Sequence, residues 1–480
     1  MRKSEMKQKD DLGRQMDLFG RSGEELEGGT AGGTGEGSPS RAEFLSVLER
    51  QRTLTENLME RVVDYVNLKR AYERVKENGG SSGTDGMEVE ELGTWLVKNI
   101  GVLQRALLTE QYKVEPVRMV EIPKPGGGKR VLGIPTVRDR MIQQSIQQEL
   151  SIYYDPLFSE SSYGFRPGRS AHQAILRAAE YVKEGGEWVV DIDLEKFFDK
   201  INHDRLMQRL SKGIGDKRLL RLIRAYLQAG MMHEGLVEQR TAGTPQGGPL
   251  SPLLSNIVLD ELDKELERRG HRFCRYADDC NIFVRSRKAG ERVMSTMIDF
   301  IEKKLKLKVN REKSGVRHCS DVRFLGYTIM PEGGIRASDK SIDRLRDKIR
   351  EITRRNRGTR LEVVIRELNI TIIGWANYYK LSNTWLSNFD TLDGWIRRKV
   401  RCYRLKQCGR RYTIFKFLRS LDTPVKPSWN AIMYSHGWWE LSNKNTIRNA
   451  MNLGWFAQLG LQSLSLKFKV KPLTETAVVR

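Results

Sequence analysis

Two adjacent acids, Asp278 and Asp279, lie between two short apolar runs at residues 273–276 and 282–284. These runs are rich in aromatic and branched residues, so the sequence predicts a hairpin with both acids at its tip. Adjacent carboxylates repel each other, and burying them is costly unless a cation lies beside them. The pair therefore predicts either a cation-binding turn or an ordinary solvated turn, and this fragment alone leaves both open.

A second pair of acids, Asp191 and Asp193, ends the apolar run that begins at Trp188. Side chains alternate along a strand, so the two carboxylates share one face. The chain then turns over residues 195–199 and enters a helix near His203. An acid at the end of a buried strand is costly without a cation, so this strand predicts a metal ligand, with Asp191 and Asp193 as the candidates.

Two glycine-rich segments could hold phosphates or a nucleotide. Residues 120–135 predict a strand, a glycine turn and a returning strand, with Lys124, Lys129 and Arg130 on the turn. Flexible cations there could close over a phosphate chain, and surface decoration is the alternative. Residues 244–252 predict a stiff loop that leads into a helix, and its glycines let a nucleotide or another backbone approach closely. A plain junction between loop and helix is the alternative for that segment.

The composition limits the class of protein. The chain has 480 residues, a net charge of +22 and a pI near 9.7, which favours polyanions as partners. Residues 341–420 carry 20 Lys and Arg against 7 Asp and Glu, an excess of 13. Five cysteines without a Cys-x-x-Cys pair predict a reducing compartment. The sequence also predicts neither a signal peptide nor a membrane span.

The outer parts of the chain differ from its middle. The first 40 residues are charged and then glycine-rich, with seven glycines between residues 21 and 40, and predict a disordered segment. A capping-box pattern at Ser40 and Glu43 starts a helical region that extends to about Glu77. Further expected elements are a loop over 78–86, helices from Thr136 and Ser170, helices over 253–268 and 293–305, and a strand over 322–329.

The ordered set of motifs is more specific than its parts. A strand with Asp193, a glycine-rich helix entry and a hairpin with Asp278 and Asp279 resembles a reverse transcriptase, and more narrowly the protein encoded by a bacterial group II intron. The resemblance covers about residues 41–330, and a second resemblance extends to the C-terminus. It implies an α/β (α+β) right-hand polymerase, with fingers and palm over 41–335, an all-helical thumb or maturase domain over 336–425 and a basic nucleic-acid-binding segment over 426–480.

The resemblance also implies roles for the acids. Asp193, Asp278 and Asp279 would bind the two Mg²⁺ ions of nucleotidyl transfer, which activate the attacking 3′-hydroxyl and neutralise charge on the leaving pyrophosphate. Asp193 is preferred to Asp191 because Phe198 then lies five residues further on. Such enzymes place a bulky side chain at that position, against the 2′ position of the sugar.

Nucleotide contacts follow from the same resemblance. Phe198 implies deoxynucleotides as substrates, because it would clash with a ribose 2′-hydroxyl. Gln246 would lie near the incoming nucleotide, and Lys124 and Arg130 of the fingers hairpin would bind its triphosphate. Lys313 matches a palm lysine that assists the leaving group.

Arginine rows characterise the last third of the chain. One expected helix carries Arg346 and Arg350 outside its apolar face, and another carries Arg397, Arg401 and Arg404 along one side. Rows of arginine beside aromatic residues suit phosphate contacts and base stacking. Their position after the palm resembles the maturase domain of group II intron proteins, which implies binding to intron RNA and help with its splicing.

The sequence therefore predicts an RNA-directed DNA polymerase that uses an RNA template, a DNA target or primer and deoxynucleoside triphosphates. It also predicts binding of group II intron RNA for splicing and for mobility by target-primed reverse transcription, in a ribonucleoprotein of the bacterial cytoplasm. The region after residue 420 has no Cys and one His, so the endonuclease module of many relatives is expected to be absent. The alternatives are a reverse transcriptase of a defence or CRISPR-associated system, a non-catalytic splicing cofactor on the same scaffold, and a general basic RNA-binding protein.

Overall fold

The structure is a computed structural model that describes residues 57–123, 129–233, 236–238, 243–244, 247–384 and 386–469. It divides into two compact units. The first comprises Met1–Ala174, Val190–Ile282 and Glu291–Gly315, and the second comprises Ile175–Val189, Phe283–Gly290 and Val316–Arg480. The segment predicted to be disordered, residues 1–40, lies outside the described residues, as does the capping box at Ser40.

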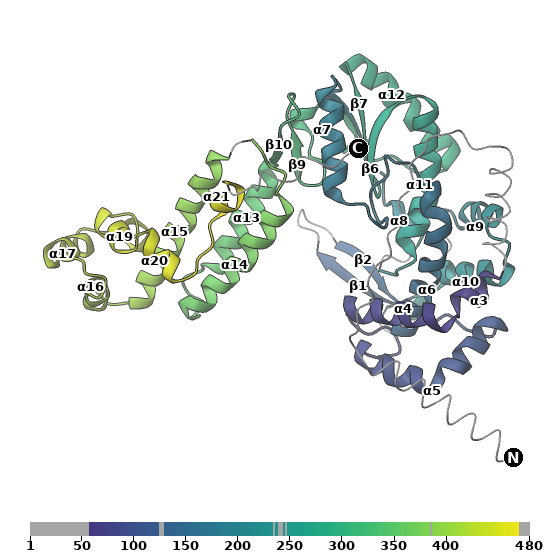
Figure 1. Cartoon of the computed structure of the whole chain (residues 1–480), viewed down its shortest axis with the longest axis horizontal. Helices are drawn as coiled ribbons and strands as arrows, with labels where there is room; N and C mark the ends of the chain where they lie inside the picture. Colours follow the sequence, from purple (N-terminus) through teal and green to yellow (C-terminus); the bar gives the residue numbers. More distant parts are fainter. Residues whose placement is uncertain are drawn as a thin grey trace, which may run out of the picture. The chain divides into compact units, whose positions relative to one another are not determined.

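The first unit begins with a group of helices (Figure 1). The Asp64 carboxylate accepts hydrogen bonds from the backbone N–H groups of Val66 (2.9 Å) and Asn67 (3.4 Å) and so begins a new helix. The predicted helical region consists of two helices in the described residues and ends at Asn78, which confirms the predicted end near Glu77. The helices of this group are α3 (Leu58–Val62), α4 (Tyr65–Asn78), α5 (Val89–Leu108) and α6 (Val137–Tyr154).

A β-hairpin lies beside these helices (Figure 1). Strand β1 (Val117–Pro123) pairs antiparallel with β2 (Lys129–Ile134), which confirms the predicted strand and returning strand, whereas the predicted glycine turn between them lies outside the described residues. Strand β1 also pairs in parallel with β4 (Met231–His233), which pairs in turn with β5 (Leu236–Glu238). The predicted helix start at Thr136 is confirmed, since its Oγ1 accepts a hydrogen bond from the Asp139 N–H at 3.1 Å.

A second four-stranded sheet, with the order β6-β7-β3-β8, carries the predicted acids. Its strands are β3 (Trp188–Ile192), β6 (Arg272–Tyr276), β7 (Asp279–Val284) and β8 (Gly315–His318). Ser170 and Gln173 form the predicted capping box, at 2.7 and 3.3 Å, before α7. The accompanying helices are η1 (Asp155–Leu157), α7 (Ala171–Lys183), α8 (Phe197–Lys200), α9 (His203–Gly213), α10 (Lys217–Gln228), α11 (Ser251–Arg268), α12 (Arg287–Asp299), the π-helix η2 (Phe300–Leu305) and η3 (Cys319–Asp321).

The strand predicted over residues 322–329 is interrupted, which is a correction. Leu325 (φ 50°) and Gly326 (φ 83°) adopt left-handed backbone conformations that an extended strand cannot contain. Phe324 and Tyr327 close the resulting turn with two backbone hydrogen bonds of 3.0 and 2.9 Å. Only β9 (Tyr327–Ile329) is a strand, and it pairs antiparallel with β10 (Ile335–Ala337).

The rest of the second unit is helical and has two apolar clusters. One joins α13, α14 and most of α15 with α20 and α21, and includes Leu345, Ile396 and Phe468. The other joins the end of α15 with α16 to α19, and includes Leu405 and Ile414. Helix α15 thus links both clusters (Figure 1). The helices are α13 (Asp339–Ile352), α14 (Leu361–Tyr378), α15 (Ser387–Cys408), α16 (Arg411–Arg419), α17 (Val425–Met433), α18 (Trp438–Leu441), α19 (Asn445–Ala450), α20 (Leu453–Gln458) and α21 (Leu464–Lys469).

Two further features concern the whole chain. Among the helices of the described residues, none combines the length and the apolar character that crossing a membrane requires. All five cysteines are free thiols, and Cys280 is buried in the second sheet, where burial raises the pKa of its thiol.

Candidate active site

The hairpin tip predicted from the sequence is a tight turn between β6 and β7. Ala277 has a left-handed backbone conformation (φ 57°), so the chain reverses there and Asp279 opens β7. Asp278 is half-buried in the turn and Asp279 is exposed. The two adjacent carboxylates therefore differ in their surroundings, and the side chain of Asp278 is the more buried of the two.

A buried arginine fixes this turn from inside. Arg275 and Asp263 both have fully buried side chains, and their ion pair measures 2.5 Å. The Arg275 guanidinium also donates to Asn256 Oδ1 (3.0 Å), to the Ala277 carbonyl (2.8 Å) and to Ser162 Oγ (2.7 Å). With two hydrogen bonds to Asp263, all five of its N–H groups have partners. Burial is the largest influence on the pKa of Arg275 and lowers it, but the charge and hydrogen bonds of Asp263, with smaller contributions from Cys280 and Asp260, together raise the pKa above its ordinary value.

A glycine allows a second backbone to lie against the same turn. A Cβ atom on Gly164 would lie 2.3 Å from the Ala277 nitrogen and 2.9 Å from the Tyr276 carbonyl carbon. The Gly164 carbonyl accepts a hydrogen bond of 2.8 Å from Asn256 Nδ2, so the same amide contacts both this loop and Arg275. The turn is therefore held from two sides, and any larger residue at position 164 would displace it.

Asp193 directly follows β3, the strand that neighbours β7. Its backbone N–H donates to Ser314 Oγ (2.9 Å), and its carbonyl accepts from the Asn310 N–H (2.8 Å). Lys313 Nζ lies 3.6 Å from Asp193 Oδ2, and the Lys313 side chain is 71% exposed. The structure thus places two residues that the sequence singled out next to each other. Asp191, the rival candidate, lies within β3 and is half-buried.

The turn after β3 presents Phe198. Lys196 has a left-handed conformation (φ 49°) and begins α8, which contains Phe198. The Phe198 carbonyl accepts a hydrogen bond of 2.7 Å from the Thr244 N–H. Gly243 (φ 85°) lies so close to Asp199 that a Cβ atom would come within 2.8 Å of its backbone. The segment that leads to the predicted glycine-rich loop therefore packs directly against the Phe198 turn.

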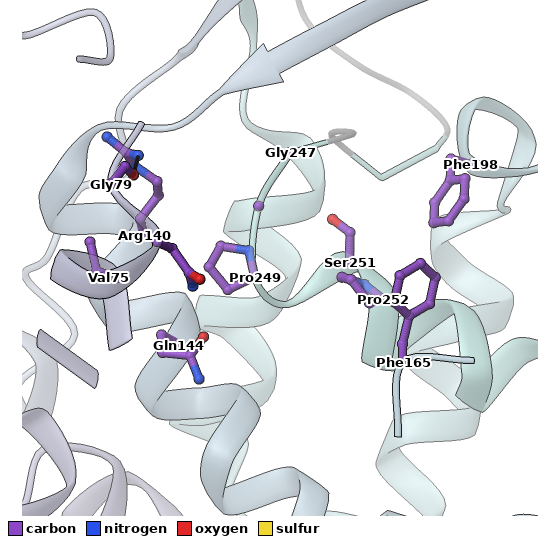
Figure 2. Close-up of a pocket in the computed structure, with 12 residues that line it drawn as sticks. Val75, Gly79, Arg140, Gln144, Phe165, Phe198, Gly247, Pro249, Ser251 and Pro252 are labelled. Atoms are coloured by element: carbon purple, nitrogen blue, oxygen red, sulfur yellow. Dashed lines mark hydrogen bonds between the residues drawn. The ribbon is translucent and has the colours of Figure 1, made fainter. Parts of the chain in front are cut away.

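Phe198 lines a pocket of about 420 Å³ in the first unit (Figure 2). Phe165 and Phe198 lie at one end of the pocket, Arg140 and Gln144 lie at the other, and Pro249 lies between them. The glycines that directly follow Gln246 also line it, so the glycine-rich segment does border an open space. The remaining lining residues are Val75, Asn78, Gly79, Gly247, Gly248, Ser251 and Pro252.

Several predicted nucleotide contacts cannot be placed. Lys124 and Gln246 lie outside the described residues, and the side chain of Arg130 is likewise outside them, although its backbone belongs to β2. Lys129 is described, and its Nζ lies 2.5 Å from Glu121 Oε2 in an exposed ion pair on the same hairpin. The roles of Lys124, Arg130 and Gln246 remain predictions.

The three predicted RNA-binding arginines of α15 have different surroundings. Arg401 is only 9% exposed, donates to the Met451 carbonyl (3.2 Å) and lies over the Phe456 ring. Burial, together with the charge of Arg397, lowers the pKa of Arg401 to about 10. Arg397 and Arg404 are half-buried. The burial of Arg401 argues against its direct contact with RNA and assigns it to packing, whereas the other two keep accessible surface.

Comparison with known proteins identifies the family. The family model for reverse transcriptase (RNA-dependent DNA polymerase) matches residues 122–329, and that for the group II intron maturase-specific domain matches residues 342–418. Protein YkfC of Escherichia coli (strain K12) is 33% identical over 52% of this chain and 75% of its own length. Group II intron-encoded protein LtrA of Lactococcus lactis subsp. cremoris is 30% identical over 67% of this chain and 69% of its own length. This chain belongs to the group II intron-encoded reverse transcriptases.

Membership of this family of intron-encoded reverse transcriptases confirms the predicted fold class and activity. The chain is an RNA-directed DNA polymerase with a maturase domain and a function in splicing and mobility, and its family generally uses divalent metal ions. A solved Cas6-RT-Cas1--Cas2 complex is 25% identical over 52% of this chain and 43% of its own chain. Its TM-score of 0.34 is too low to support an argument about function.

The sequence reasoning missed the Arg275 network in this intron-encoded reverse transcriptase. The sequence does contain a signal for this network. Arg275 lies two residues after Phe273 in the same strand, so its side chain points to the same inward face. Asn256 and Asp263 are likewise polar residues on a helix whose other buried residues are mostly apolar. Buried charges require partners, and these two patterns together indicate an arginine held inside the fold.

Proposed function

We propose that this reverse transcriptase holds two Mg²⁺ ions with Asp193, Asp278 and Asp279 and extends a DNA primer along an RNA template. The observation that carries the proposal is the turn with Asp278 and Asp279, which Arg275 anchors through the Ala277 carbonyl. This turn leads into β7, the strand that pairs with β3, and Asp193 directly follows β3. Catalytic carboxylates need such fixed positions, because small displacements cost much of the rate.

The residues present fit divalent cations. Carboxylate oxygens are ligands that Mg²⁺ prefers, and it is usually bound by one or two carboxylates together with substrate phosphates and water. Within the described residues, no three Asp, Glu, His or Cys side chains form a ready-made metal site. We propose that the nucleotide phosphates and water supply the remaining ligands of both ions. Such ions would activate the primer 3′-hydroxyl and stabilise charge on the leaving pyrophosphate.

The other residues of the site position the substrate. Lys313 places its ammonium 3.6 Å from the Asp193 carboxylate, and its exposure gives the side chain room to turn towards a leaving pyrophosphate. Phe198 lines the pocket next to Phe165, where its ring would exclude a 2′-hydroxyl and so select deoxynucleoside triphosphates. Lys124, Arg130 and Gln246 complete the proposed nucleotide contacts.

A second proposed activity concerns intron RNA. We propose that the second unit binds group II intron RNA, promotes its splicing and directs target-primed reverse transcription, in a ribonucleoprotein of the bacterial cytoplasm. The support is that the excess of 13 cations over residues 341–420 falls in the region that matches the maturase-specific domain, residues 342–418. Such an excess favours contacts with RNA phosphates.

The test of the polymerase site is primer extension on an RNA template with Mg²⁺ and deoxynucleotides. Asp193→Asn and Asp278→Asn should each lower the rate about a thousandfold or more, since losing a metal ligand costs several kcal/mol of transition-state stabilisation. Asp191→Asn, two residues earlier in β3, is the matched control and should keep most of the activity. Equal losses in Asp191→Asn and Asp193→Asn would refute the choice of Asp193.

The two activities can be separated in one set of proteins. The Asp278→Asn enzyme should still bind a transcribed group II intron RNA and stimulate its splicing as well as wild type does. Wild-type protein that binds and splices the RNA but extends no primer would overturn the polymerase proposal and leave a non-catalytic splicing cofactor. Wild-type protein that extends primers but does not bind the intron RNA would overturn the maturase proposal.

A further inference from the structure

A second pocket, of about 410 Å³, lies in the helical part of the second unit. Its half-buried aromatic wall consists of Phe417 from α16 and Trp455 from α20. Its rim carries two cations, Arg360 and Arg404, and one carboxylate, Glu362. The remaining lining residues are Leu361, Gln407 and Leu459. A ligand in this pocket could therefore contact aromatic rings, arginine guanidinium groups and one carboxylate.

The walls of the pocket are fixed before any ligand binds. Tyr403 (2.7 Å) and Gln407 (2.9 Å) both donate to the Thr359 carbonyl, which anchors the rim beside Arg360 to α15. Asn369 of α14 donates a hydrogen bond of 2.8 Å to the carbonyl of Gly460, which lies just after α20. This bond anchors the other wall of the pocket to α14. Preorganised walls lower the ordering cost of binding.

The aromatic wall and Arg404 provide flat faces for stacking. The Arg404 guanidinium lies 4.5 Å from the centre of the Phe417 ring, and the Trp455 ring meets Phe417 edge-on at 69° and 6.5 Å. No hydrogen bond or ion pair joins the Arg404 guanidinium to another residue in the described part of the chain. Proteins bind unstacked RNA bases by stacking them on aromatic rings and on guanidinium planes.

The carboxylate narrows the choice of ligand. A site for phosphate alone would have no use for Glu362, because like charges repel. Among the bases, guanine presents two adjacent donors, N1–H and the 2-amino group, which match the two oxygens of a carboxylate. It also presents O6 and N7 as acceptors, which arginine recognises. Arg360 can therefore bind O6, N7 or the adjoining phosphate while Glu362 binds the donor edge.

We propose that this pocket binds one unstacked guanine of an RNA strand. The base stacks against Arg404 and the aromatic wall of Phe417 and Trp455, Glu362 accepts hydrogen bonds from N1–H and the 2-amino group, and Arg360 binds the neighbouring phosphate. The inference rests on the proposed binding of RNA by the second unit, and it adds a base-specific subsite to that function.

The test measures binding of the full chain to short uridine RNAs that differ at one central base. The RNAs carry guanosine, inosine or adenosine there, and fluorescence anisotropy at fixed salt gives their affinities. Wild type should prefer guanosine to inosine, which lacks the 2-amino group, and to adenosine by roughly 5- to 100-fold. The Glu362→Gln variant should lose this preference and keep its affinity for the plain uridine strand.

The matched control is Glu351→Gln, which removes an exposed carboxylate of α13 outside the pocket and should keep the preference. Equal binding of the three RNAs by wild type, or an unchanged preference in Glu362→Gln, would overturn the guanine site. Binding of a transcribed intron RNA, measured on the same preparations, distinguishes this failure from failure of the maturase proposal. A protein that binds intron RNA without any guanine preference refutes only the pocket.

Discussion

Arg275 connects the turn between β6 and β7 to the interior of the protein. Its guanidinium contacts α11 through Asp263 and Asn256, the preceding loop through Ser162, and the turn itself through the Ala277 carbonyl. Because its side chain is fully buried and all five of its N–H groups bind other parts of the protein, we assign Arg275 as a positioning residue. Its role is to keep the turn that carries Asp278 and Asp279 in one place.

Removing this arginine should therefore reduce both stability and catalysis. Arg275→Met leaves Asp263 charged and unpaired in the interior, which costs about 3–5 kcal/mol of unfolding free energy. The double variant Arg275→Met, Asp263→Leu removes both charges and should recover most of that loss in urea unfolding. Because the turn still lacks its anchor, we expect kcat to stay low in the double variant while KM changes little. Recovery of kcat along with stability would show that Arg275 serves stability alone.

Phe198 allows a prediction about sugar selection. Phe198→Val shortens a side chain that lines the proposed nucleotide pocket, so a ribose 2′-hydroxyl should fit more easily. We expect the ratio of kcat/KM for deoxynucleotides to that for ribonucleotides to fall roughly 10- to 100-fold. The control is Phe165→Val, which changes the other ring at the same end of the pocket. An equal fall in both variants would refute a specific role of Phe198.

At the scale of elements, the C-terminal helix α21 is bound into the core of α13 to α15. The Asp393 carboxylate of α15 accepts hydrogen bonds from the backbone N–H groups of Leu464 (2.9 Å) and Ser465 (3.0 Å), at the start of α21. Phe468 stacks on Phe389 with ring centres 4.2 Å apart. Helix α21 thus closes a cluster that starts at Leu345, more than a hundred residues earlier.

Detaching this helix should destabilise the second unit. Phe468→Ala removes a buried ring and should cost about 3–5 kcal/mol, and Asp393→Ala removes the cap and should cost about 0.5–2 kcal/mol. Both variants should expose the chain after residue 459 to limited proteolysis. Lys467→Ala, an exposed change on the same helix, is the control and should resist the protease as wild type does. Equal resistance in all variants would refute the contribution of α21.

The elements also show what the sequence could and could not predict. The Asp-Asp hairpin, the fingers hairpin and the helix starts at Thr136 and Ser170 follow from patterns within a few residues, and all were predictable. The burial of Arg401 was not, because the Met451 carbonyl and the Phe456 ring that cover it belong to a distant segment. Similarly, the turn that interrupts residues 322–329 depends on a left-handed Leu325, which no side-chain pattern reveals.

At the scale of the whole molecule, buried tyrosines should make the protein less stable at alkaline pH. In the first unit, Tyr112 (2.8 Å) and Tyr226 (3.1 Å) donate to the same oxygen of Asp139. Burial and then the Asp139 charge raise the pKa of both hydroxyls above the ordinary value of 10.0. In the second unit, burial raises the pKa of Tyr327, whose hydroxyl donates to the Tyr378 carbonyl.

The direction of the effect follows from these raised values. A tyrosine that ionises near pH 10 when unfolded, and only at higher pH when folded, contributes stability that is fully present below pH 10. That stability is lost as the pH rises above 10, by up to about 1.4 kcal/mol per tyrosine and pH unit. The contribution of these tyrosines to the free energy of unfolding, measured with urea on the full chain, should therefore not change with pH near pH 8.5. It should decrease steeply between pH 10 and 11.

Replacing individual tyrosines separates the contributions of the two units. Tyr226→Phe removes one titrating hydroxyl of the first unit while Asp139 keeps its hydrogen bonds from Tyr112 and Thr136, so the slope of stability against pH should become shallower for that unit. Tyr327→Phe should do the same for the second unit. Tyr412→Phe changes an exposed ring and serves as the control, with a slope equal to that of wild type. If Tyr226→Phe and Tyr327→Phe show the same slope of unfolding free energy against pH as wild type, other groups cause the loss of stability above pH 10.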